Sequence, residues 1–366
     1  THLSMGLLRN YADDMELFEW LNNRIWPVEG KLTPEDVYIG SRLGILEMIL
    51  SGTTAFADMY FFQEAACEAV EQSGIRGSIG LTFFGEMEKT EERLSGYEEL
   101  HHRWNGRADG RIRIDTAPHA IYTCSEETLR AAVEFSAANG TRIHTHLSET
   151  ARENADADRQ HRMSPTQYLE SMGIFDRPGH AAHCVHMSAD DRSILKQHGI
   201  TPVHNPSSNM KLGSGFAPLP EFISEGFHVA LGTDGASSNN NLNMVEEMHI
   251  ASLIHKGHTG DPTAVNAYET LKMATLHGAE ALGIDDLCGS ITVGKEADLI
   301  IIDTRTPHLT PLNDPVSALV YSAQAADVET VICGGTIVMD ERQVTTMPVE
   351  TVIREATDCA RKLLGN

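Results

Sequence analysis

The chain has 366 residues, 41% of them hydrophobic, which is enough for one α/β barrel with additions or for two domains. Its formal net charge of −24 argues against nucleic acid or an anionic membrane as the main partner. The six cysteines include no CxxC pair, which is typical of a reduced, cytoplasmic protein, and no apolar run is long enough to span a membrane.

Strands and helices alternate from residue 31 onward. Thr33 and Pro34 predict the start of a helix that continues to Leu50. Seven apolar stretches follow, with helices between several of them. They are nearly continuous, as parallel strands covered on both faces require. We expect these strands at residues 53–58, 75–81, 112–117, 142–146, 179–184, 200–204 and 227–234.

Polar side chains gather where these predicted strands end. In a (β/α)₈ barrel the C-terminal ends of the strands form one rim, where such enzymes place their chemistry. A doubly wound sheet would spread the same residues along a line, so the pattern favours an α/β TIM barrel. We expect the eighth strand at the start of the chain, ending in His2. The other strand-end residues are Asp58, His119, His146, His183, His204 and Asp234.

The pattern changes after a helix predicted at residues 269–282. Residues 289–303 indicate a hairpin that turns at Gly294, residues 328–338 indicate a second pair of strands, and residues 348–364 indicate a final helix. These antiparallel strands do not continue the alternation and predict a separate small β layer. We therefore expect a barrel over residues 1–285, the C-terminal strands of a β-sandwich layer over 286–346, and a helix over 347–366.

One short run, residues 142–150, ends a predicted core strand in imidazole and carboxylate groups. His144 and His146 are two residues apart, so on a strand they point the same way, and Glu149 follows in the loop. Packing alone gives no reason for such an ending. A metal site with an adjacent proton carrier is such a reason, although two of the 18 histidines could also meet by chance.

Three further residues are candidates for the same site: His2, His183 and Asp234. Three nitrogen or oxygen ligands with one open position are the pattern of catalytic zinc or iron, which activates a water molecule. Glu149 and Asp234 would then move protons, and His183 would orient or polarise the reacting group. Two plainer alternatives stay open: His183 as a core histidine, and Asp234 as the cap of the 235–238 turn.

Five motifs in this order are similar to those of a known superfamily. They are Thr-His-Leu at the start, His-Thr-His-Leu-Ser-Glu, Ala-Ala-His-Cys-Val-His, His-Asn-Pro-Ser-Ser-Asn and Leu-Gly-Thr-Asp-Gly-Ala. The set resembles the amidohydrolase superfamily, and more narrowly the branch of the 5′-methylthioadenosine/S-adenosylhomocysteine deaminases. The likeness extends over essentially the whole chain, including Gly-Ser-Ile-Thr-Val-Gly-Lys-Glu-Ala-Asp-Leu-Ile near the end.

The resemblance implies a role for each candidate of the site. His2, His146 and Asp234 become the ligands of one divalent metal, Zn²⁺ in preference to Fe²⁺. Asp234 also takes a proton from the water, and Glu149 moves a proton to the ring nitrogen. His183 holds the attacking hydroxide or the leaving group.

The resemblance also implies a set of substrate contacts. Trp20 and Glu29 would line a nucleoside pocket, with Glu29 as acceptor for the two ribose hydroxyls. His119 and His183 would also touch the substrate, and Arg93 would meet the group on the 5′ side. Simple packing of Trp20 and a solvated charge at Arg93 remain equally acceptable interpretations.

Two departures from the family pattern bear on these expectations. The histidine expected directly before Thr1 is absent, so we expect this sequence to be a piece of a longer, active enzyme. No second arginine follows residues 79–84. Its absence weakens the case for S-adenosylhomocysteine relative to methylthioadenosine, 5′-deoxyadenosine or adenosine.

The expected function is metal-dependent hydrolytic deamination of an adenine nucleoside to its inosine analogue and ammonia. One alternative is a deaminase or chlorohydrolase of another N-heterocycle, such as guanine, 8-oxoguanine or an s-triazine. A second alternative is a catalytically dead binding protein. The partner is expected to be a small nucleoside, not nucleic acid or membrane, and the protein is expected to be a homo-oligomer.

Overall fold

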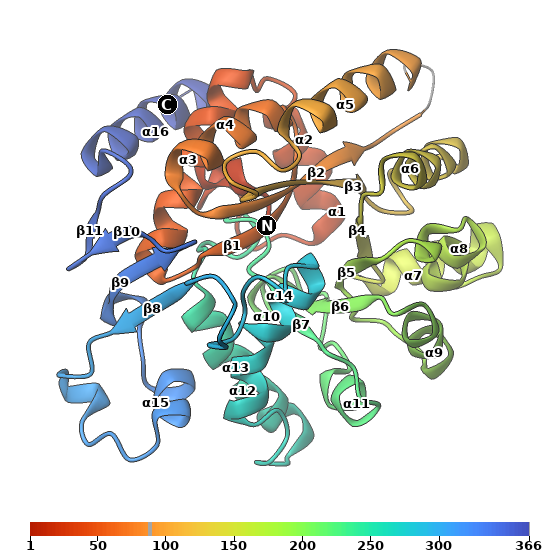
Figure 1. The fold of residues 1–366 in the computed structure, drawn as a ribbon. Helices are drawn as coiled ribbons and strands as arrows, with labels where there is room; N and C mark the ends of the chain where they lie inside the picture. The colour runs from red at the N-terminus through yellow and green to blue at the C-terminus, as the bar shows by residue number, and fades with distance from the viewer. Residues whose placement is uncertain (87–89, 366) are drawn as a thin grey trace.

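The structure is a computed structural model that describes residues 1–86 and 90–365. Its main sheet holds seven parallel strands in chain order, each hydrogen-bonded to the next. The sheet curls, and helices cover its outer side (Figure 1). The TIM-barrel prediction is confirmed. The strands are β1 (Ala55–Tyr60), β2 (Arg76–Phe83), β3 (Ile112–Pro118), β4 (Ile143–Leu147), β5 (Gly179–His183), β6 (Thr201–His204) and β7 (Ala230–Leu231).

Three of the longer helices begin at a side-chain cap. Thr33 caps α3 in a reciprocal capping box with Asp36, and Ser125 and Ser188 accept backbone N–H bonds at the starts of α6 and α9. The helices of the barrel region are α3 (Pro34–Ser51), α4 (Gln63–Ser73), α5 (Thr90–Trp104), α6 (Glu126–Asn139), α7 (Ala151–His161), α8 (Pro165–Ser171), α9 (Ala189–His198), α10 (Pro206–Lys211), α11 (Leu219–Ser224), α12 (Met244–Thr259), α13 (Ala267–Met273) and α14 (Leu276–Leu282).

The first two residues bridge the edges of the curled sheet. The Thr1 amino group donates to Ala57 O, and Met59 N donates to Thr1 O at 3.2 Å, as a parallel neighbour of β1 would. Thr1 Oγ1 also donates to Asp234 O at 2.9 Å, beyond the end of β7. Thr1 and His2 therefore lie where the eighth strand was predicted, although the described residues contain no eighth strand of this sheet.

Two predicted elements of the barrel differ from the prediction: one strand is shorter, and one helix is divided in two. The strand predicted over 227–234 pairs only at β7, because β6 offers it just Val203 and His204, and the backbone turns left-handed at Asp234. The helix predicted over 269–282 is two helices, α13 and α14. Thr275, with φ −129° and ψ −93°, interrupts the helical backbone between them.

The C-terminal part forms a second, antiparallel sheet in the order β11-β10-β9-β8. The pair predicted over 328–338 is present as β9 and β10, and the predicted last helix is α16, which packs on α3. The hairpin predicted over 289–303 is wrong: only β8 forms, and Ile291 and Val293 before it are fully exposed. The elements are β8 (Leu299–Ile302), α15 (Pro315–Tyr321), β9 (Val328–Cys333), β10 (Thr336–Asp340), β11 (Gln343–Val344) and α16 (Val349–Leu364).

The separation of two sheets agrees with the change in pattern near residue 285, while the exact part boundaries at 285 and 346 stay a prediction. All six cysteines are buried and unpaired. Within the described ranges, no helix combines the length and the apolarity that crossing a membrane requires.

Candidate active site

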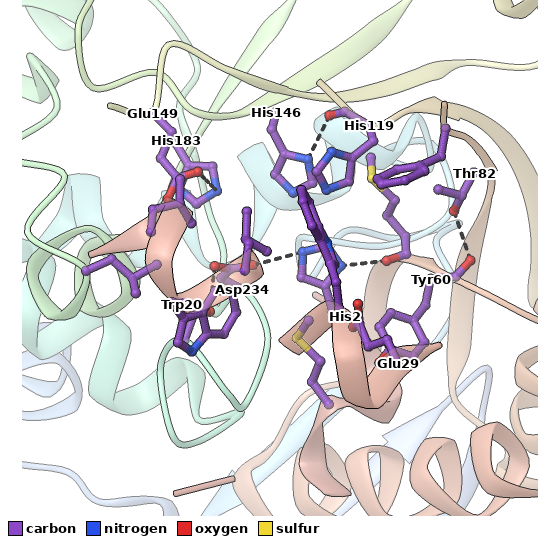
Figure 2. Close-up of a pocket in the computed structure, with 18 of the residues that line it drawn as sticks. His2, Trp20, Glu29, Tyr60, Thr82, His119, His146, Glu149, His183 and Asp234 are labelled. Atoms are coloured by element: carbon purple, nitrogen blue, oxygen red, sulfur yellow. Dashed lines mark hydrogen bonds and ion pairs between the residues drawn. The ribbon is translucent and has the colours of Figure 1, made fainter. Parts of the chain in front are cut away.

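A pocket opens at the carboxyl ends of the barrel strands (Figure 2). Four of the six strand-end residues singled out in the sequence line it: His119, His146, His183 and Asp234. The parallel sheet brings them together because its strands all end on the same rim. The first thirty residues cover this rim with a 3₁₀ helix (Leu3–Leu8), α1 (Leu17–Trp20), a π-helical turn (Leu21–Ile25) and α2 (Trp26–Glu29).

His2, His146 and Asp234 form a group that could hold a metal ion. One ligand atom from each lies within 4.8 Å of the others. His2 Nε2 is 3.4 Å from Asp234 Oδ1, and the rings of His2 and His146 stack with centroids 5.2 Å apart. Two imidazoles and one carboxylate are a ligand set that suits zinc and leaves a coordination position open.

The two histidines of this group are held in the tautomer that metal binding needs. His2 Nδ1 donates to Met59 O at 2.6 Å, and His146 Nδ1 donates to His119 O at 2.8 Å. A carbonyl oxygen only accepts, so each Nδ1 carries the proton and each Nε2 keeps its lone pair. Burial, and then the neighbouring histidines, keep the pKa of His146 well below its usual value, so the ring stays neutral. These observations fit a divalent metal.

Asp234 presents one carboxylate oxygen to His2 and the other to two hydroxyls. Ser208 Oγ and Ser238 Oγ each donate to Asp234 Oδ2 at 2.7 Å. Burial acts to raise the pKa of Asp234, but His2, His183 and the other neighbours outweigh it and lower this pKa. Asp234 therefore stays ionised.

Glu149 and His183 lie together beside this group (Figure 2). His183 Nε2 is 3.8 Å from Glu149 Oε2, and both side chains are almost fully buried. Burial raises the pKa of Glu149. Burial also acts to lower the pKa of His183, but the charges of Glu149 and then Asp234 raise it overall. A carboxyl group with a raised pKa thus lies beside an imidazole, a pairing suited to proton transfer.

The backbone turns left-handed at three of the strand ends that carry these groups. The φ angles are +49° at Ser148, +73° at His183 and +58° at Asp234. For residues other than glycine this conformation is strained, and it is found mostly at functional sites. No residue pattern in the sequence predicts these left-handed residues.

The other end of the pocket contains a buried carboxylate. Glu29 is 8% exposed, and burial raises its pKa to about 7, against the effect of a hydrogen bond from the Tyr60 hydroxyl. In the described residues, Glu29 Oε1 and the indole Nε1 of Trp20 are buried without a hydrogen-bond partner. Buried polar atoms are normally satisfied, so these two atoms indicate that a ligand completes the site.

The wall around Glu29 is apolar. No lysine or arginine is among the described residues that line the pocket. Arg93 is exposed and lies outside this lining, where its Nη1 donates to Phe84 O at 2.9 Å. Arg93 therefore contacts a lining residue, Phe84, but does not itself line the pocket. The apolar lining residues are Met5, Leu17, Trp20, Leu21, Trp26, Met59, Phe61, Phe84 and Leu212.

Three residues singled out in the sequence lie elsewhere. His144 does point into the barrel, but it packs on His180 below the pocket, with ring centroids 4.4 Å apart. Asp58 precedes the end of β1 by two residues and accepts a hydrogen bond from Leu3 N at 2.7 Å. His204 turns outward to His255, with 3.1 Å between their Nε2 atoms. Each has a partner outside the pocket, so the strand-end rule included residues that do not line it.

Several residues of the site escaped the sequence argument. Tyr60 and Thr82 follow apolar strands and look like core residues, so no signal marked them. Ser208 and Asn209 belong to the His-Asn-Pro-Ser-Ser-Asn motif, to which no role had been assigned. That motif was the signal in the sequence that could have marked Ser208 and Asn209 as site residues.

Residues 1–338 match the Amidohydrolase family. A 5-methylthioadenosine/S-adenosylhomocysteine deaminase of Thermoanaerobacter pseudethanolicus is 50% identical over 366 residues, which cover 100% of this chain and 85% of the relative. A 5′-deoxyadenosine deaminase of Methanosarcina acetivorans is 47% identical and covers 100% of this chain and 84% of its own length. The solved structure of a Xanthomonas campestris adenosine deaminase with bound zinc superposes with a TM-score of 0.95, at 34% identity and over 100% of this chain and 84% of that one. This chain belongs to the amidohydrolase family and, within it, to the 5-methylthioadenosine/S-adenosylhomocysteine deaminases.

Proposed function

We propose that this chain hydrolytically deaminates an adenine nucleoside, giving the inosine analogue and ammonia. The observation that carries the proposal is the pairing of two groups in one pocket. A metal-type cluster beside a carboxyl group of raised pKa lies at one end, and a buried carboxylate with an unpartnered oxygen lies at the other. The names of the relatives agree with this reaction.

The cluster would hold a divalent metal, for which we propose zinc, through His2, His146 and Asp234. When bound, such an ion supplies Lewis-acid activation of a water molecule. Asp234, kept ionised by its neighbours, accepts a proton from the attacking water. Glu149, whose pKa is raised by burial, delivers a proton to the ring nitrogen, and His183 stabilises the charge on the attacking oxygen. Water adds at the ring carbon that bears the amino group. Asp234 then passes its proton to the amino group, which leaves as ammonia, and the new hydroxyl returns a proton to Glu149 as it becomes the carbonyl.

The substrate we propose is a nucleoside with a small, apolar 5′ substituent. Glu29 accepts hydrogen bonds from the two ribose hydroxyls, and Trp20 and His119 line the sugar and the base. Because no lysine or arginine is among the described lining residues, a charged amino-acid tail gains little there. Methylthioadenosine, 5′-deoxyadenosine and adenosine should therefore be used at least as well as S-adenosylhomocysteine.

The alternatives predict different pockets. A free base or an s-triazine has no ribose, so it would leave Glu29 buried and unsatisfied. A dead binding protein has no need of paired carboxyl groups with opposite pKa shifts. The absence of disulfides among the six buried cysteines supports a place in the cytoplasm, and the homo-oligomer stays a prediction.

A substrate panel tests the proposal. Zinc-loaded protein is incubated with methylthioadenosine, 5′-deoxyadenosine, adenosine, S-adenosylhomocysteine, adenine, guanine and an s-triazine, and ammonia release is measured. We expect turnover of the nucleosides and a loss of turnover after chelation of the metal. Turnover of only free bases or triazines would refute a nucleoside as the substrate. No turnover of any compound would favour the alternative of a binding protein.

A further inference from the structure

One short segment contacts Asp234, Glu149 and His183, the three side chains that move protons or stabilise charge in the proposed reaction. It begins in α10 and continues to Ser214. Ser208 Oγ donates to Asp234 Oδ2 at 2.7 Å, and Asn209 Oδ1 accepts a bond from His183 Nδ1 at 2.8 Å. The remaining contact is longer: Ser214 Oγ donates to Glu149 Oε1 at 3.4 Å.

The segment is built as a rigid part of the barrel. Ser208 and Asn209 are both essentially unexposed, and Ser214 N donates to Asn209 O at 2.8 Å, which closes the turn after α10. Lys211 fastens the helix on its other side, through a bond to Ser237 O at 3.0 Å and an ion pair with Asp13 at 2.6 Å. Adjacent helical residues point about 100° apart, so Ser208 and Asn209 reach two different groups.

The bond from His183 determines which of its nitrogens faces the pocket. An amide oxygen only accepts, so His183 Nδ1 carries the proton and Nε2 is the atom turned toward Glu149, 3.8 Å away. Among the described residues, Asn209 is the partner of His183 Nδ1. Asp234 Oδ2, in contrast, has a second donor in Ser238.

We propose that Ser208 and Asn209 are positioning residues, which hold Asp234 and His183 in one mutual orientation through a single helix. This inference rests on the proposed deamination and assigns a role in it to the His-Asn-Pro-Ser-Ser-Asn motif. We expect the two residues to differ in how strongly their loss lowers kcat. Among the described residues only Asn209 bonds His183 Nδ1, whereas Ser208 shares its carboxylate oxygen with Ser238.

The first experiment compares Asn209→Leu with Asn209→Asp in the zinc-loaded protein, with methylthioadenosine as substrate. Asn209→Leu should lower kcat by about 10- to 100-fold, as loss of an orienting partner does, while KM and zinc content stay unchanged. Asn209→Asp keeps an acceptor oxygen and should recover most of kcat. The matched control is Ser207→Ala on the same helix, because Ser207 Oγ has no hydrogen-bond partner in the described structure.

A second measurement does not depend on turnover. Nitrogen-15 NMR of histidine-labelled protein should show His183 protonated at Nδ1 in the wild type and in Asn209→Asp, and a mixture of tautomers in Asn209→Leu. An unchanged His183 signal in Asn209→Leu overturns the inference even if the wild type deaminates nucleosides. A wild type that turns over no nucleoside but shows the expected tautomers would instead refute the proposed function alone.

The third measurement uses the shared oxygen of Asp234. Ser208→Ala and Ser238→Ala should each lower kcat by about threefold or less, because the other hydroxyl remains. The double variant should lose clearly more than the product of the two single losses, since Oδ2 then has no donor. Single losses that simply multiply, or a Ser208→Ala loss as large as that of Asn209→Leu, would contradict the shared role.

Discussion

The two ends of the pocket are made from different parts of the chain. At the reaction end (His146, Glu149, His183 and Asp234), each group lies at or just after a barrel strand. At the substrate end (Trp20, Trp26, Glu29 and Phe84), the groups come from the rim-covering helices and from the residue after β2.

The chemistry of the two ends also differs. At the reaction end the reacting side chains have partners: carbonyls hold the histidines, and hydroxyls and an amide oxygen hold Asp234 and His183. At the substrate end, polar atoms of Trp20 and Glu29 are buried without a partner. The comparison indicates that the reaction end is organised before the substrate arrives, whereas the substrate end is completed by the substrate.

The largest effect is expected from the reaction end. His146→Ala removes one of three metal ligands, so elemental analysis should show most of the metal gone. The loss of several kcal/mol of charge stabilisation should lower kcat/KM by about 10⁴-fold or more. His144→Ala, on the same strand but below the pocket, is the matched control and should keep its metal. Full metal occupancy in His146→Ala would refute the assignment of His146 as a metal ligand.

Next in size is the proton carrier. Glu149→Gln keeps the shape of the side chain but cannot deliver a proton, so kcat should fall by roughly 10²–10⁴-fold, as loss of a general acid or base does. Metal content and KM should stay close to wild type, because Glu149 is not among the ligands. Normal turnover of this variant would mean that another group carries the proton.

The substrate end should respond in a different parameter. Glu29→Ala removes the acceptor for two ribose hydroxyls, at about 1.5 kcal/mol or more each, and should lower kcat/KM for methylthioadenosine by about 10²-fold. Any activity on free adenine should change little, since adenine has no ribose. Equal losses on nucleoside and base would place Glu29 in the chemistry and weaken the contrast between the two ends.

The pH dependence sharpens the same contrast. Burial raises the pKa of Glu29 to about 7, so the free enzyme carries this carboxyl mostly protonated below pH 7 and mostly ionised above it. The ionised form is the better acceptor, so kcat/KM for methylthioadenosine should rise by about tenfold between pH 6 and 8. Glu29→Gln cannot ionise and should flatten this rise. A rise that persists unchanged in Glu29→Gln would assign it to another group.

The smallest effect is expected at Arg93. Its guanidinium is exposed and bonds a backbone carbonyl outside the pocket lining, so Arg93→Ala should change kcat/KM for methylthioadenosine by about threefold or less. Comparing this substrate with S-adenosylhomocysteine provides the control. A loss of tenfold or more that is confined to S-adenosylhomocysteine would show that Arg93 reaches the 5′ group after all.

The sequence predicted that the residues of the reaction end would lie together. A histidine or aspartate at the end of an apolar strand is a visible signal, because core strands have no packing use for such groups. Parallel strands then bring the signals together at one rim, so His146, Glu149, His183 and Asp234 could be grouped before any coordinates. The same rule included His204 and Asp58, which have partners of their own, since strand position alone does not say which way a side chain leaves the rim.

Only the tertiary structure decided the rest. The partners that orient the site, such as the carbonyls of Met59 and His119, are backbone atoms that any residue would supply, so no residue type reveals them. The left-handed turns at His183 and Asp234 likewise depend on how the strand ends pack. Whether Glu29 is a surface acid or a buried acceptor depended on the rim-covering helices folding over the barrel, because burial is a property of the assembled chain and not of a residue's neighbours in sequence.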